Sequence, residues 1–445
     1  MSREFIHEWF RYVDAANVDY NNLVAAKIYR KHGLTFPPIS LSQTKKRRQQ
    51  DNQALLFISG DRSPETPRTV KRRDINSDTR FMSQALSLLS DHTGQTSNSG
   101  RGSPTKMLAK LEIREMRQRA MNNTESGDYP KPLEKLIEDI EKAITLHNGL
   151  FYKEQREQIS KYVEANPTRR QDFKICYERD ELYTNSRDKQ LDSIGLCEYE
   201  RRLNPEFVRF ILDEARDCDE RSYDEASWNM RVHYPLMRRV ITGASEICDS
   251  CGDTTVTVVP CTTARLIGEF KVPSSKAHKV DFALALKPAQ RVADALELQR
   301  IFMPERSLNH TDYKPLLDQP IAVSVETDND FENAKVQLMV WLAAQWRKLE
   351  SMAVSPPELL PAIIIQGHDW FLVASTRANN GTKTFWYKTP IGSTSKPLGI
   401  FKIAWTLQYL SRWAVSTHWS WFKTTCLGFD MDSEEQDLCQ EQATE

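Results

Sequence analysis

The sequence predicts an α/β fold, and three observations carry this prediction. Residues 280–286 and 321–328 alternate apolar and polar side chains with the two-residue period of a β-strand. Residues 331–350 then change to the period of a helix, with an apolar stripe along one side. Acidic residues stand at the ends of both strands, just ahead of this helix. Carboxylates at the ends of apolar strands that lead into a helix indicate a metal site at a sheet edge.

The composition excludes some functional classes. The chain has 445 residues, enough for two or three domains, and its 40% hydrophobic and 27% charged residues are ordinary for a globular protein. A net charge of −1 excludes overall basicity as a reason to bind nucleic acid, so any such binding must use local patches. No apolar run approaches the ~20 residues that span a bilayer, and the N-terminus lacks an apolar signal core. We therefore expect an intracellular protein that does not enter a membrane.

The first hundred residues fall into two parts. Residues 1–34 are expected to form amphipathic helices, and residues 35–106 a disordered linker rich in Ser, Thr, Pro and charge. This linker holds two basic clusters, Lys45, Lys46, Arg47, Arg48 and Lys71, Arg72, Arg73. Such clusters are typical of nuclear-import signals and of arms that contact nucleic-acid phosphates, but also of solvated charge runs. The sequence leaves these alternatives open.

A helical lead-in is predicted at residues 107–200, with helices at 107–121, 132–147 and 152–163. A core domain at residues 201–425 follows, and an acidic, disordered tail at 426–445 ends the chain. Asn204-Pro205-Glu206 opens the first core helix, because Asn is a good N-cap and Pro suits the first helical position.

The helix after Ser222 has two interpretations. Ser222-x-x-Glu225 matches a capping box, in which the glutamate bonds back to the N-cap amide. Alternatively, Glu225 contributes to the acidic site. His233 further along is expected to be a core or cap histidine, and Pro235 should kink or end the helix.

The remaining elements are expected in a simple order. A first strand at 263–272 precedes the strand at 280–286, and a short helix at 291–302 follows it. After the helix at 331–350, strands are predicted at 361–365, 370–374 and 384–388. A helix from residue 398 to about 422 closes the core.

Several short motifs occur in a recognisable order along the core: Glu225-Ala-Ser-Trp-Asn229 with Val232-His233, Val280-Asp281-Phe282, Leu308-Asn-His-Thr311, Pro320 to Thr327, and Gln337-Leu338 with Trp341 to Trp346. This order resembles the PD-(D/E)XK nuclease superfamily, and more closely the nuclease-like domain of many uncharacterised fungal proteins. The resemblance covers roughly residues 200–425. It implies a restriction-endonuclease-like core, in which helices flank a mixed central sheet.

The resemblance also implies roles for individual residues. Asp281, Glu326, the Thr327 carbonyl and Glu225 would hold Mg2+ or Mn2+, since hard cations prefer oxygen ligands. Gln337 would lie near the metal or the substrate strand. Asp281, Glu326 and Asp328 are then expected within a few ångströms of one another at one end of the sheet.

The lysine that the superfamily uses for catalysis is missing. Asp328 stands in its place and reverses the charge. Lys335 or Lys279 could substitute for it, although Lys335 lies about 200° around the helix from Gln337.

Two functions follow from the resemblance. The first is a Mg2+-dependent phosphodiesterase that acts on DNA or RNA with a degenerate site, where residues Asp281, Glu326, Asp328, Gln337 and Lys335 would be catalytic. The second is an inactive nuclease-like fold that binds a partner. An accessory role in a fungal secondary-metabolite pathway is one form of this second function.

Overall fold

A computed structural model describes residues 116–121, 129–145, 150–184, 203–242, 254–272, 279–301, 303–353 and 355–427. The predicted N-terminal helices, the linker with its two basic clusters and the acidic tail from residue 428 onward lie outside the described residues. The described part belongs to one compact unit of the chain.

A mixed sheet of seven strands forms the centre of this unit, in the order β1-β9-β8-β7-β6-β5-β4. The pairs β6–β7 and β1–β9 are parallel and the other pairs are antiparallel. The strands are β1 (Arg117–Ala120), β4 (Thr254–Pro260), β5 (Phe282–Pro288), β6 (Ile321–Thr327), β7 (Leu359–Gln366), β8 (Asp369–Arg377) and β9 (Lys383–Ser393). The sheet with its flanking helices confirms the predicted fold class.

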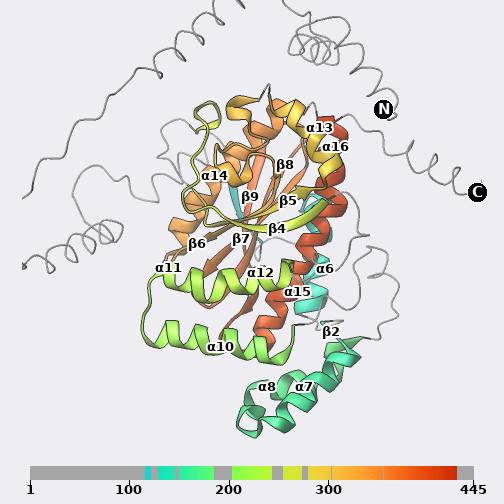
Figure 1. The fold of residues 1–445 in the computed structure, drawn as a ribbon, viewed down its shortest axis with the longest axis vertical. Coiled ribbons are helices and arrows are strands. Elements are labelled where there is room, and N and C mark those ends of the chain that lie inside the picture. Colours follow the sequence, from blue (N-terminus) through green and yellow to red (C-terminus); the bar gives the residue numbers. More distant parts are fainter. Residues whose placement is uncertain are drawn as a thin grey trace, which may run out of the picture. The chain divides into compact units, whose positions relative to one another are not determined.

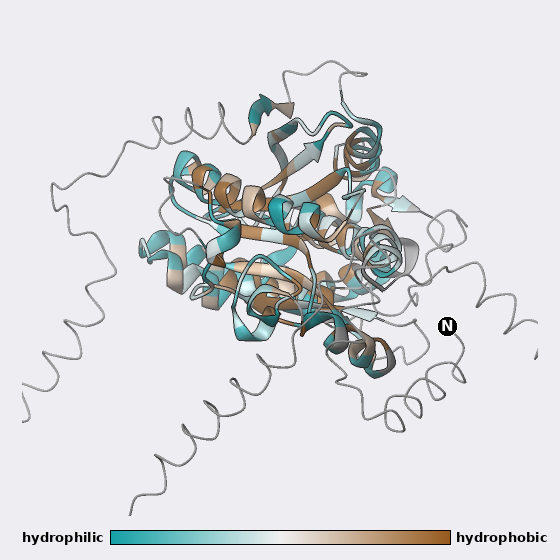
Figure 2. Ribbon diagram, turned by 90° about the horizontal axis from the view of Figure 1, so that it is seen from above, coloured by the Kyte–Doolittle hydropathy of each residue, from teal (hydrophilic) through white to brown (hydrophobic). Residues whose placement is uncertain are grey.

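Different helices cover the two faces of the sheet (Figure 1). On one face lies α14 (Phe331–Met352), whose Trp341 donates to Ser324 of β6 at 3.1 Å. The other face packs against α6 (Lys131–Ile144), α12 (Tyr234–Thr242) and α15 (Pro397–Trp413), and α10 (Pro205–Glu220) packs in turn on α15. Figure 2 shows hydrophobic residues gathered along the strands between these layers.

The two central strands are buried along almost their whole length. All seven residues of β6 are buried, as are the first seven of β7. Strands covered by helices on both faces need apolar side chains on both. A polar side chain on β6 is therefore costly unless it has a partner or a function, and Glu326 is such a side chain.

Several strand ends meet at one edge of the sheet. The residue before β5, Asp281, donates its backbone N–H to Val325 of β6 at 3.1 Å. The ends of β6 and β7 lie side by side, because Thr327 pairs with Ile365. Asp369 at the start of β8 pairs with the last residue of β7 and with the last residue of β9. This edge is where the sequence predicts the acidic site.

The lead-in contributes a strand that the sequence analysis missed. Residues 117–120 were expected inside a helix at 107–121, but they form β1, which pairs with β9 in parallel register. The edge of β9 offers unpaired backbone groups, and these outweigh the helical preference of four residues. The other two predicted lead-in helices exist as α6 and α7 (Lys153–Ala165), and a further helix that was not predicted, α8 (Arg170–Glu178), follows them. A small parallel pair, β2 (Phe151–Tyr152) with β3 (Tyr183–Thr184), joins them.

The predicted first strand at 263–272 is wrong. The strand is β4, which begins nine residues earlier, and residues 263–272 form turns with a short 3-10 helix at Gly268–Phe270. The run of Thr and Val in β4 has the stronger strand preference. The helix at 291–302 is confirmed as α13 (Gln290–Arg300), and the strands around the turn at residue 367 are confirmed as β7 and β8.

Two of the described helices contain a stretch of π-helix. The helix after Ser222 runs as α11 (Glu225–Trp228), the π segment η4 (Asn229–His233) and α12. Pro235 therefore does not end the helix. The π turn directly before it changes the hydrogen-bond register, so that the helix continues. The closing helix is built the same way from α15, η8 (Ala414–Trp419) and α16 (Ser420–Leu427). None of the described helices is long and apolar enough to cross a membrane.

Candidate active site

Four carboxylates gather at the edge of the sheet where β5 begins and β6 ends: Glu225, Asp281, Glu326 and Asp328. We call them the carboxylate cluster. Burial is the largest cause of the raised pKa of all four, and the charges of other members add to the rise at Glu225, Glu326 and Asp328. Like charges this close cannot all stay ionised without a cation.

Glu225 reaches the cluster because another residue caps its helix. The N-cap of α11 is Asp224, whose Oδ1 accepts from the backbone N–H of Ser227 at 2.9 Å. The capping-box interpretation of Ser222 and Glu225 is therefore wrong. Burial, followed by the charges of Asp281 and Asp328, raises the pKa of Glu225 to about 7.

Asp281 is held in place by the residue that ends β6. Its Oδ2 accepts from the backbone N–H of Thr327 at 2.9 Å and from the Thr327 hydroxyl at 2.7 Å. Burial nevertheless outweighs these two bonds and raises the pKa of Asp281. One carboxylate oxygen is thus fully engaged.

Glu326 is the most buried member of the cluster, with only 3% of its surface exposed. No described residue makes a hydrogen bond to its Oε2. Burial, and then the charges of Asp281, Glu225 and Asp328, hold the pKa of Glu326 well above its usual range. A buried carboxylate oxygen without a partner is expensive unless it binds something.

Asp328 lies where β6 passes into the loop before α14. Its Oδ1 accepts from the backbone N–H of Asp330 at 2.8 Å, and its Oδ2 lies 3.4 Å from Nε2 of Gln337. Burial raises the pKa of Asp328. Gln337 thus reaches the cluster through Asp328.

A buried chain of hydrogen bonds supports the cluster from behind. Asn229 donates from Nδ2 to the Thr327 hydroxyl at 2.9 Å, and its Oδ1 lies 2.9 Å from Nδ1 of His233. His233 Nε2 lies 3.0 Å from the carbonyl oxygen of Gly367, in the turn between β7 and β8. The chain therefore runs from this turn to Thr327 and on to Asp281. It fixes the orientation of the Asp281 carboxylate.

The protonation of His233 decides how this chain is arranged. Complete burial lowers the pKa of His233 to about 4, so the ring is neutral and carries one N–H. Asn229 Oδ1 and the Gly367 carbonyl oxygen face the two ring nitrogens, and both can only accept, so the single N–H of the neutral ring donates to one of them.

Asn229 escaped the sequence analysis. It occurs in the motif with Glu225, but an asparagine inside a helix carries no signal of a buried polar chain. The role expected for His233 as a core histidine agrees with its full burial and its two polar neighbours.

A comparison with protein families matches residues 158–419, more than half of the chain, to the PD-(D/E)XK nuclease superfamily. The chain belongs to this superfamily. No curated protein matches the sequence.

PD-(D/E)XK nucleases typically use divalent metals, and the residues here fit such an ion in their chemistry. The cluster offers several carboxylate oxygens, and one of them, Oε2 of Glu326, is buried and without a partner. In their present arrangement, no three acidic, His or Cys side chains of the described residues stand close enough to hold one ion together.

The two lysines considered as substitutes lie in different places. Lys335 binds Glu332 at 2.7 Å, and its ammonium sits 4.5 Å from the ring centre of Tyr387. The structure does not bring it to the cluster, because its position on α14 turns it toward β9. Lys279 lies just before Asp281, and its charge opposes the raised pKa of Glu225, Asp281 and Glu326. Its ammonium also donates to the Thr262 carbonyl.

Proposed function

We propose that the protein is a divalent-metal-dependent phosphodiesterase acting on nucleic acid, in which Asp328 slows hydrolysis. The observation that carries the proposal is the cluster itself, with one buried oxygen of Glu326 left without a partner. Glu225, Asp281, Glu326 and the Thr327 carbonyl would hold the ion. When bound, a divalent ion activates water and stabilises charge that develops on the phosphate.

The chain's own residues divide the remaining work. Thr327 holds one oxygen of Asp281, so that the other is free for a ligand. Lys279 supplies positive charge to three members of the cluster, and it is our candidate for part of the missing lysine's role. Gln337 holds Asp328 at 3.4 Å beside the site. The negative charge of Asp328 repels a scissile phosphate.

The two basic clusters at Lys45 to Arg48 and Lys71 to Arg73 would add contacts to nucleic-acid phosphates that do not depend on sequence. They fit nuclear import equally well.

A single substitution tests the catalytic proposal. Asp328→Lys restores the superfamily pattern and should raise Mn2+-dependent cleavage of a labelled oligonucleotide by roughly 100-fold, the usual size of one electrostatic group in catalysis. Asp328→Asn is the matched control, because it removes the negative charge without adding a positive one. It should give a smaller gain. Strong wild-type cleavage that Asp328→Lys abolishes would show that the roles assigned to this site are wrong.

The position of Asp328 also favours a second candidate, an inactive nuclease-like fold that binds a partner. Both oxygens of Asp328 accept hydrogen bonds from groups within the protein, as expected for a residue with a structural role. Under this alternative Asp328→Lys stays inactive with every nucleic-acid substrate, although the cluster still binds a divalent ion.

A further inference from the structure

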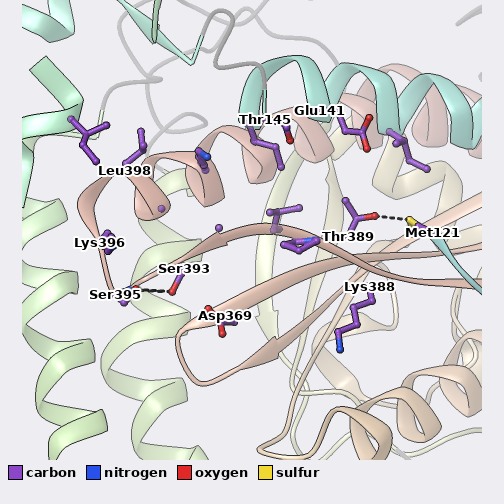
Figure 3. A pocket seen from close by; sticks show the side chains of 18 of the residues that line it. Met121, Glu141, Thr145, Asp369, Lys388, Thr389, Ser393, Ser395, Lys396 and Leu398 are labelled. Atoms are coloured by element: carbon purple, nitrogen blue, oxygen red, sulfur yellow. Dashed lines mark hydrogen bonds between the residues drawn. The ribbon is translucent and has the colours of Figure 1, made fainter. Parts of the chain in front are cut away.

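A second site lies apart from the carboxylate cluster. A cavity of about 640 Å³ is enclosed by α6, the last residues of β9 and the start of α15 (Figure 3). None of the four clustered carboxylates lines it. Its volume falls in the range of small-molecule sites, and its floor is apolar, formed mainly by Ile137, Ile144, Ile391 and Leu398.

Two lysines line one end of this cavity. Lys396 directly precedes α15, and Lys402 lies one turn after Leu398 on the same side of that helix. Within the part of the chain that the structure describes, neither lysine forms an ion pair. Burial, and then the charge of Arg179, lower the pKa of Lys402. A half-buried cation without a counter-ion favours an anionic ligand.

The serines at the end of β9 complete this end of the cavity. The hydroxyls of Ser393 and Ser395 lie 3.0 Å apart, and Figure 3 shows them beside Lys396. The wall is rigid here, because a Cβ on Gly399 would lie 2.0 Å from the Ser393 carbonyl oxygen. Only glycine allows α15 to approach β9 this closely.

Three acidic groups also line the cavity, Glu141, Asp172 and Asp369. Glu141 comes from α6, and Figure 3 shows it away from Lys396 and Ser395. Asp172 comes from α8, whereas Asp369 pairs with Ser393 in the β8–β9 register and so stands at the same end as the two serines. Ionised carboxylates only accept hydrogen bonds, so they suit the hydroxyl groups of a ligand rather than its phosphate.

We propose that this cavity binds a phosphate monoester of nucleotide size. The phosphate lies among Lys396, Lys402 and the two serine hydroxyls, the sugar hydroxyls donate to the carboxylates, and the base rests on the isoleucine floor. A free nucleotide and the phosphorylated end of a nucleic-acid strand share this chemistry. The inference does not rest on the catalytic proposal, because the two sites share no residue.

Calorimetric titration of the full chain with AMP tests this site, in EDTA so that the carboxylate cluster holds no metal. AMP should bind more tightly than adenosine or inorganic phosphate. The double variant Lys396→Ala, Lys402→Met should bind AMP at least about tenfold more weakly, the size expected for lost bonds to a charged group. Lys402→Arg keeps the charge and should retain binding. Lys287→Met is the matched control, because Lys287 lies near the end of β5 and does not line the cavity. This variant should bind AMP like the wild type.

Competition by hexanucleotides then distinguishes the two sources. A 5′-phosphorylated hexanucleotide that displaces AMP, where its 5′-hydroxyl counterpart does not, identifies a strand end as a ligand. If neither hexanucleotide displaces AMP, the ligand of the cavity is a free nucleotide. The proposal is overturned if neither AMP nor the phosphorylated hexanucleotide binds, if adenosine binds as tightly as AMP, or if the double variant melts cooperatively and binds like the wild type.

Discussion

At the scale of single residues, Glu225 should make the stability of the protein depend on pH. Its pKa is raised to about 7 in the folded protein from a usual value near 4.5. Between these values the folded state keeps a proton that the unfolded state has lost. The stability that Glu225 contributes is thus complete below pH 4.5 and is lost as the pH rises through 7. Without metal, Glu225→Gln should therefore match the wild type near pH 4.5 and become the more stable protein by pH 8.

Urea unfolding of both proteins in EDTA from pH 4.5 to 8 measures this difference. The buried His233 and His418, each with its pKa lowered to about 4, produce the opposite trend in both proteins. The stability that these two neutral histidines contribute is lost as the pH falls below 6.5. The loss is the same in both proteins and cancels when they are compared. If the difference in stability between the two proteins did not vary with pH, the pKa of Glu225 would not be raised as the cluster requires.

Lys388 on β9 carries strain of another kind. Its φ of 77° lies in the left-handed region, at a bulge where Tyr387 and Lys388 stand opposite Val373. This conformation costs a non-glycine residue about 1–2 kcal/mol. Lys388→Gly removes the strain but also the ammonium that lies 5.3 Å from the ring centre of Phe331. We expect a net gain of about 0.5–1 kcal/mol in the free energy of unfolding.

A neighbouring position on β9 provides the comparison. Thr384 is not among the residues with positive φ, so Thr384→Gly should destabilise by about 0.5–1 kcal/mol. Urea denaturation gives both values. Destabilisation by Lys388→Gly equal to that of Thr384→Gly would rule out strain at the bulge.

At the scale of elements, the packing of α15 against β9 depends on one glycine. A Cβ at residue 399 would lie 2.0 Å from the Ser393 carbonyl oxygen and 2.8 Å from its nitrogen. These are backbone atoms, which cannot swing aside. Gly399→Ala should therefore cost about 3 kcal/mol of stability, the upper part of the usual range for overpacking.

Gly268, in the 3-10 helix before β5, is the control for this prediction. A Cβ there would meet nothing within 4 Å, so Gly268→Ala should change stability by less than about 0.5 kcal/mol. Thermal melts of the two variants separate the outcomes. Equal melting temperatures would contradict the close contact between α15 and β9.

The elements differ in how far the sequence predicted them. Strong local signals were enough for β6, α14 and the β7–β8 hairpin, because their periodicity and turn residues are local. The strand β1 was missed because its pairing partner, β9, lies more than 260 residues later in the chain. The π segment before Pro235 was missed because no local pattern distinguishes it from a helix end.

At the scale of the whole molecule, the sheet assembles the site from distant parts of the chain. Asp281 and Glu326 could be placed together from the order of the strands. That Glu225 belongs with them could not be decided, since Ser222-x-x-Glu225 also matches a capping box and only the structure shows that Asp224 caps this helix. The link through Asn229 and His233 required the turn at Gly367, which only the folded sheet brings near.

The central claim is that the carboxylate cluster binds a divalent ion, and unfolding by urea with and without Mn2+ tests it most directly. An ion that binds only the folded state stabilises it by about 2.7 kcal/mol at a hundredfold excess over its dissociation constant. We predict a rise of this size for the wild type at pH 8 and its loss in Glu326→Gln, which removes the unpartnered oxygen but leaves the fold at least as stable without metal. No rise in the wild type, or the same rise in Glu326→Gln, would contradict the account.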